Sequence, residues 1–148
     1  MSAFGLPELL AYMRARRLVV VSTVDANSQP QSALVGIAVT EAFELVFDTL
    51  SSTRKHANLL ARPQVAVVFS GPGEQTLQYE GEAFAVSLGG EGDAPYRAAY
   101  YEAWPDGRER LGWKGLAYWA VRPIWARYSD FDIGPLIREF RWRSRARE

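Results

Sequence analysis

The 148-residue chain has no cysteine and only one histidine, His56. Without cysteine there are no disulfides, thiolate metal sites or cysteine nucleophiles. A formal net charge of zero gives no overall field to attract nucleic acid or an anionic membrane, so any anion site must be local. No apolar run approaches a membrane span, and the first residues lack the apolar core of a signal peptide. We therefore expect a cytoplasmic protein with neither nucleic acid nor membrane among its partners.

The composition is that of a globular protein, with 48% hydrophobic and 23% charged residues. A chain of this length can bury a real core, and no repeat or low-complexity segment divides it. We expect a single domain spanning residues 1–148.

Alternating and β-branched apolar runs predict six strands, and helical composition predicts three short helices. Gly81 is a candidate bulge within the fifth strand. The pattern predicts a mainly β fold with flanking helices, a six-stranded antiparallel barrel that is closed or nearly closed. The expected strands are residues 18–24, 31–39, 43–49, 65–69, 76–87 and 116–128, and the expected helices are 7–17, 56–62 and 94–104.

Hydroxyl residues and two cations connect the third expected strand to the second helix. Ser51, Ser52 or Thr53 can supply the cap, which places Arg54 and Lys55 in the first turn. Cations there oppose the helix dipole at a cost of roughly 0.3–1 kcal/mol. Free N–H groups, hydroxyls and two positive charges would suit a phosphate. The alternative is an exposed turn whose cations are solvated.

Four segments form a recognisable series along the chain. They are residues 29–35 (QPQSALV), 47–55 (FDTLSSTRK) with 58–59 and 62–67 behind it, 78–83 (QYEGEA) and, more weakly, 122–130. The most specific is the second, which runs from an aromatic-x-Thr strand end through a small-residue turn to Arg-Lys. Together the segments extend over nearly the whole chain and resemble the FMN-binding split-barrel proteins related to pyridoxamine 5'-phosphate oxidase.

The resemblance implies an FMN-binding split barrel that forms a homodimer, with two FMN molecules at the subunit interface. Arg54 and Lys55 would hold the FMN phosphate, with a hydroxyl from Thr53 or Ser52. Asp48 and Thr49 would line the turn near the ribityl chain and the ring. The remaining residues implied to contact the isoalloxazine are Ala33, Leu34 and Val35, through backbone groups, and Gln78, from a neighbouring strand of the same chain or of the partner.

Two departures from the oxidase pattern bear on the substrate. The oxidase carries an arginine at the position of Ala33, and an Arg-x-His signature near its C-terminus, whereas no histidine follows His56 here. Oxidation of pyridoxamine 5'-phosphate itself is therefore not expected.

The chain is poor in catalytic groups, and this fits a cofactor that performs the chemistry itself. We expect an FMN-dependent oxidoreductase for an unidentified small molecule, with no protein catalytic residue and with NAD(P)H or another donor as reductant. The alternatives are a deazaflavin-dependent reductase and a non-catalytic carrier of flavin or haem. Haem would have to use His56, the only imidazole available.

The C-terminal segment carries Arg138, Arg141, Arg143, Arg145 and Arg147. A basic strip for phosphate or nucleic acid is one interpretation. The favoured one is a segment that packs apolar side chains such as Leu136, Ile137 and Phe140 onto the body.

Overall fold

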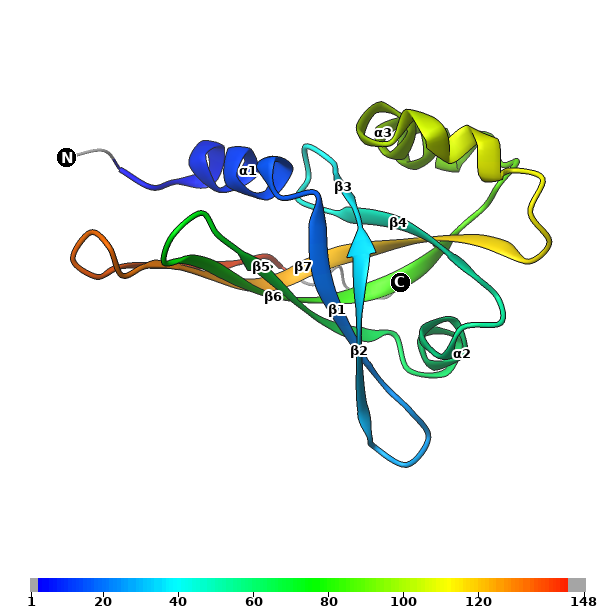
Figure 1. Ribbon diagram of the computed structural model, residues 1–148, viewed down its shortest axis with the longest axis horizontal. Coiled ribbons are helices and arrows are strands. Elements are labelled where there is room, and N and C mark those ends of the chain that lie inside the picture. Colours follow the sequence, from blue (N-terminus) through cyan, green and yellow to red (C-terminus); the bar gives the residue numbers. More distant parts are fainter. Residues whose placement is uncertain (1–2, 144–148) are drawn as a thin grey trace.

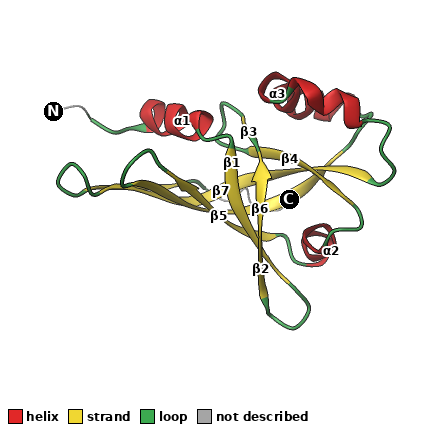
Figure 2. Ribbon diagram, viewed as in Figure 1, coloured by secondary structure: helices red, strands yellow, loops and turns green. Residues whose placement is uncertain are grey.

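The computed structural model describes residues 3–143. Eight antiparallel strands form one curled sheet, and three α-helices lie around it (Figures 1 and 2). The helices are α1 (Leu6–Ala15), α2 (Arg54–Ala61) and α3 (Ala94–Ala103), and α3 leads into a 3₁₀ helix, η2 (Pro105–Arg110). The strands are β1 (Leu18–Val24), β2 (Pro30–Gly36), β3 (Ala38–Val39), β4 (Leu45–Leu50), β5 (Gln64–Ser70), β6 (Gln75–Val86), β7 (Leu116–Asp130) and β8 (Leu136–Arg141). No helix among residues 3–143 is long and apolar enough to cross a membrane.

The strands follow the order β2-β1-β5-β6-β7-β4-β3, and β8 joins β7. Two strands pair with different parts of β7: β4 with residues 116–121 and β8 with residues 125–130. β2 and β4 come into contact without pairing, so the curled sheet stays open between them. This is a split barrel, as the sequence predicts.

The apolar residues form two clusters, one on each face of β4. The larger fills the inside of the curl and receives Leu45 and Phe47 from β4. The smaller lies under α3 and receives Val46, which packs with Tyr100 and Tyr118. Successive side chains of a strand point to opposite faces, so this alternation also fixes the directions of the polar residues that end β4.

The prediction of six strands is wrong in number, although the class of fold is confirmed. The expected strand 31–39 is two strands, because the chain leaves β1 after Gly36 and starts pairing with β4 at Ala38. β8 was not predicted as a strand. Its Leu136 and Phe140 do pack against the main core, as expected of the C-terminal segment, whereas Arg145 and Arg147 lie outside the described residues.

The expected bulge at Gly81 is confirmed by a register shift between Glu80 and Gly81 where β6 pairs with β7. A Cβ at Gly81 would lie 2.4 Å from the carbonyl oxygen of Arg122. Only glycine allows the two backbones to approach this closely.

Candidate functional site

The turn between β4 and α2 gathers hydroxyl groups and a lysine at the start of the helix. Thr53 caps α2, and its Oγ1 accepts a hydrogen bond from the N–H of His56 (3.4 Å). The same oxygen lies 2.9 Å from Oγ1 of Thr49, which accepts a hydrogen bond from Nζ of Lys55 (3.2 Å). The predicted cap and the predicted first turn are therefore both present. Thr49, Thr53 and Lys55 form one connected group, which we call the hydroxyl-lysine cluster.

Among the residues that the structure describes, the cations of this turn form no ion pair. Within residues 3–143, no carboxylate lies within 4.0 Å of the side-chain nitrogens of Arg54 or Lys55, and the first turn of α2 has no acidic residue. Burial lowers the pKa of Lys55, and the negative charge of Asp48 partly opposes that change. Arg54 and Ser52 are exposed beside the cluster. A half-buried ammonium without a counter-ion is costly, and an anion would relieve that cost.

Side chains from α2 tie the helix to the ends of β1 and β2. Nδ2 of the buried Asn58 donates to Oγ1 of Thr23 (2.9 Å) and to Oε1 of Gln31 (3.0 Å). Nε of Arg62 donates to the carbonyl oxygen of Val24 (2.9 Å). The middle and the C-terminal end of α2 are thus anchored to β1 and β2, which fixes the position of the helix. Sequence reasoning gave Asn58 no such role, because its partners lie far away in the chain.

His56 is engaged by a buried tryptophan. Nε1 of Trp119 lies 3.0 Å from Nδ1 of His56. An indole nitrogen can only donate, so Nδ1 must accept and the proton of the neutral ring sits on Nε2. Neither ring nitrogen then offers a free lone pair to a metal. Among residues 3–143, no group of three or more histidine or acidic side chains could hold a metal ion.

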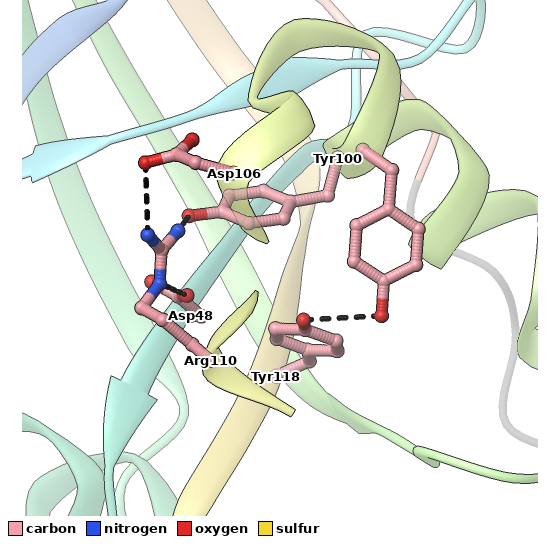
Figure 3. A network of polar contacts seen from close by, with 6 residues as sticks. Asp48, Tyr100, Asp106, Arg110 and Tyr118 are labelled. Atoms are coloured by element: carbon pink, nitrogen blue, oxygen red, sulfur yellow. Dashed lines mark hydrogen bonds and ion pairs between the residues drawn. The ribbon is translucent and has the colours of Figure 1, made fainter. Parts of the chain in front are cut away.

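Asp48 belongs to a separate network on the other face of β4 (Figure 3). Its Oδ2 accepts from Nε of Arg110 at 2.8 Å, and the two side chains are only 17% and 19% exposed. Arg110 also donates from Nη2 to the hydroxyl of Tyr100 (3.0 Å) and from Nη1 to Asp106 (3.2 Å). The hydrogen bond with Asp48 raises the pKa of Arg110, and burial raises the pKa of Tyr100.

Asp48 and Thr49 were expected to line the same turn, but they lie on opposite faces of β4. Thr49 shares its face with Phe47 and joins the hydroxyl-lysine cluster, whereas Asp48 shares its face with Val46 and binds Arg110. Arg110 lies 62 residues away in the chain, and no local pattern marks it.

The other predicted residues are not part of the cluster. On β2, Ala33 and Val35 point towards the core and Leu34 points outward, 66% exposed. Gln78 is exposed on β6. Leu34 and Gln78 lie in one row on the outer face of the sheet, where the pairings run Leu34–Val20–Val68–Gln78.

A cavity of about 850 Å³ lies elsewhere, between α1, β3 and α3. Its walls include Arg14, Val39, Tyr96 and Glu102, and none of the predicted site residues. The cavity and the hydroxyl-lysine cluster are therefore separate features.

Residues 6–130 match the sequence pattern of the family described as pyridoxamine 5'-phosphate oxidase. The chain belongs to this family. The matched residues include every strand except β8 and the whole turn between β4 and α2. No curated protein matches the chain significantly in sequence.

Solved structures share the fold of this family member at low sequence identity. A haem-binding protein from Mycobacterium smegmatis superposes with a TM-score of 0.77 at 15% identity, over 95% of this chain and 60% of the other. The haem storage protein HutZ from Vibrio cholerae superposes with a TM-score of 0.69 at 17% identity, over 79% of this chain and 88% of the other. An FMN-binding, oxidase-related protein from Nostoc punctiforme superposes with a TM-score of 0.65 at 11% identity, over 97% of this chain and 98% of the other. The chain thus spans about three fifths of the length of the first of these proteins.

Proposed function

We propose that this protein binds FMN, with the phosphate held at the start of α2. The observation that carries the proposal is the hydroxyl-lysine cluster, in which a half-buried lysine and two hydroxyls meet at a helix N-terminus, and no carboxylate of residues 3–143 lies within 4.0 Å of the lysine nitrogen. Arg54, in the same helical turn, would add a second cation, and Ser52 a further hydroxyl.

The chemistry of these groups fits a phosphate monoester. Such a group carries a charge of about −1.5 to −2 near pH 7 and three strong acceptor oxygens. The first N–H groups of a helix have no acceptor within the helix, and here Thr53 accepts from only one of them, that of His56. Lysine, arginine and these N–H groups all donate, and charge-assisted hydrogen bonds of this kind contribute on the order of 1.5–3 kcal/mol each.

Haem is the second candidate, since structural relatives bind it. An axial histidine needs a lone pair directed at the iron, and usually donates its other N–H to a neighbour. Trp119 imposes the opposite arrangement on His56. We therefore favour a flavin over haem for this chain.

When bound, FMN supplies hydride transfer at its own ring. This chain's residues would bind and orient it: Arg54, Lys55 and Thr53 at the phosphate, Thr49 beside them, and the backbone of residues 33–35 near the ring. We propose an oxidoreductase that acts on an unidentified small molecule. A non-catalytic flavin carrier and a deazaflavin-dependent reductase are the alternatives that turnover would separate.

We further propose a homodimer formed through the outer face of the sheet. Leu34, Val20 and Val68 are 66%, 37% and 48% exposed and adjoin one another across three strands. Exposed apolar side chains in contact are typical of an interaction surface. The same row continues to Gln78, so a second copy there would allow Gln78 of the partner subunit to contribute to the flavin site.

The test of the cofactor is direct. Purified protein should be yellow or turn yellow with FMN, and mass spectrometry of the released cofactor should identify FMN. A colourless protein with no thermal shift in excess FMN would refute the proposal. Oxidation of NADH or NADPH by the FMN-loaded protein would establish an enzyme rather than a carrier.

The test of the dimer is a charge on the outer face. Val68→Glu should convert a dimer to a monomer in analytical ultracentrifugation. Glu74→Gln, on the exposed turn before β6, is the control that should stay dimeric. A wild-type monomer that binds FMN would show that the interface is not required.

A further inference from the structure

The hydroxyl-lysine cluster has a carboxylate close behind it. Asp48 is the residue immediately before Thr49, whose hydroxyl accepts the hydrogen bond from Lys55. A free carboxylate at this place would attract the ammonium of Lys55 and repel any anion that approached it. The affinity of the turn for an anion therefore depends on what neutralises Asp48.

Arg110 pairs with Asp48 and opposes its charge. Each of the three guanidinium nitrogens has a partner, namely Asp48, Tyr100 and Asp106, and this fixes the side chain in place. The Asp48 and Arg110 side chains are mostly buried, so solvent screens the pair only weakly. Figure 3 shows Arg110 between the three acceptor groups.

We propose that Arg110 determines the specificity of the site for an anion, by cancelling the charge of Asp48 and so leaving Lys55 available to a phosphate. Arg110 acts through Asp48 and does not contact the ligand. The inference rests on the proposed phosphate site and goes beyond it, because it assigns a role to a residue outside the turn.

The charges make the inference specific. We sum the charges of Arg54, Lys55, Asp48 and Arg110. In the wild type Asp48 and Arg110 cancel, and the sum is about +2. Arg110→Gln leaves a buried negative charge and reduces this sum to +1. Adding Asp48→Asn to Arg110→Gln restores +2, and Asp48→Asn alone raises it to +3. A purely structural role for the ion pair predicts a different result, since each single change would then impair the site.

The experiment compares FMN with riboflavin, which lacks the phosphate, on wild type, Arg110→Gln, Asp48→Asn and the double variant. The affinity for FMN divided by the affinity for riboflavin should fall on the order of tenfold in Arg110→Gln, as expected for an unpaired negative charge near a partly buried site. It should return to within about threefold of wild type in the double variant, and should equal or exceed wild type in Asp48→Asn. Asp106→Asn, which changes an exposed partner of the same arginine, should leave the ratio unchanged. A double variant as weak as Arg110→Gln, or a loss in Asp48→Asn, would overturn the inference.

A second measurement does not depend on flavin. Asp48 is the charged side chain that acts on Lys55, Arg110 pairs with Asp48, and Arg54 and His56 are the sequence neighbours of Lys55. NMR can follow the Lys55 ammonium in the ligand-free protein. Its pKa should rise in Arg110→Gln, where Asp48 is unopposed, and fall in Asp48→Asn. If these shifts occur but wild type binds no FMN, the proposed function fails and the charge coupling stands. If FMN binds and the shifts are absent, the inference alone fails. Should Arg110→Gln not fold, Asp48→Asn decides by both readouts.

Discussion

The two faces at the end of β4 differ in how their charges are satisfied. On the Asp48 face, the guanidinium of Arg110 binds both the carboxylate of Asp48 and the hydroxyl of Tyr100. On the Thr49 face, the hydroxyl of Thr49 is the one hydrogen-bond partner of the Lys55 ammonium within residues 3–143. Asp48 thus belongs to a network whose charged groups are paired, whereas its neighbour Thr49 belongs to a cluster in which the Lys55 ammonium can donate further hydrogen bonds. The phosphate site that we propose lies on the second face, where the difference leaves donors available.

The contrast between the two faces also bears on our proposal of FMN rather than haem. The split barrel supplies the frame, and its structural relatives include both haem-binding and FMN-binding proteins. What favours a flavin here is local: cations at the start of α2, and a histidine whose Nδ1 is held by Trp119. Fold alone does not decide between ligands.

The largest expected effect comes from removing the free cations of the Thr49 face. Arg54→Ala combined with Lys55→Ala should weaken FMN binding by about 100-fold or more, because two charge-assisted contacts to the phosphate are lost. Riboflavin binding should change by less than about threefold, since it has no phosphate. Fluorescence titration measures both. The control is Arg138→Ala with Arg141→Ala on β8, which removes the same charge from exposed positions. Equal losses for FMN and riboflavin would show that the turn does not hold the phosphate.

The next effect tests how strongly Asn58 anchors α2, the helix that carries Lys55, to the sheet. Asn58→Ala removes two hydrogen bonds and leaves the buried hydroxyl of Thr23 without the Asn58 donor. The free energy of unfolding should fall by about 2–3 kcal/mol. Urea unfolding measures it, with the exposed Gln64→Ala as a control expected within about 0.5 kcal/mol of wild type. A loss below about 0.5 kcal/mol for Asn58→Ala would contradict the anchoring.

A smaller effect is expected at the cap itself. Thr53→Ala should lower the free energy of unfolding by about 1 kcal/mol, because the N–H of His56 loses its acceptor. Thr53→Ser keeps the hydroxyl and should retain most of the stability. If both variants lose the same amount, packing of the methyl group and not the hydrogen bond explains the residue.

The smallest effect is expected at Asp106, the exposed member of the Asp48–Arg110 network. Asp106 is 57% exposed and joins Arg110 at 3.2 Å, so Asp106→Ala should cost no more than about 0.5 kcal/mol in the same urea experiment. Arg110 keeps Asp48 and Tyr100 as partners. A loss well above 1 kcal/mol would mean that the network fails when its exposed member is removed, and that the two faces are less different than described.

Local features of this molecule could be predicted from the sequence. β1 coincides with the expected strand 18–24, because a continuous β-branched run has few other solutions. The cap at Thr53 and the bulge at Gly81 follow from the chemistry of single residues. β8 could not be predicted, since its arginines give an exposed strand no clear apolar alternation.

Contacts between distant segments were not predictable in the same way. The Asp48–Arg110 pair and the Asn58–Thr23 bond join residues 62 and 35 positions apart. Each depends on how α3 and α2 pack against the sheet, which no local pattern specifies. The opposite faces of Asp48 and Thr49 are a different case, because both residues lie in the expected strand 43–49 and its alternation already implies them, whereas the family resemblance placed both residues at one turn.

The most direct test of the central claim is a titration of the wild-type protein with FMN, riboflavin and haemin under the same conditions. The account predicts that FMN saturates one site per chain, that riboflavin binds at least about tenfold more weakly because it lacks the phosphate, and that haemin produces no His56-dependent shift of its absorption band. Equal affinities for FMN and riboflavin, or a haemin complex that His56→Ala abolishes, would contradict it.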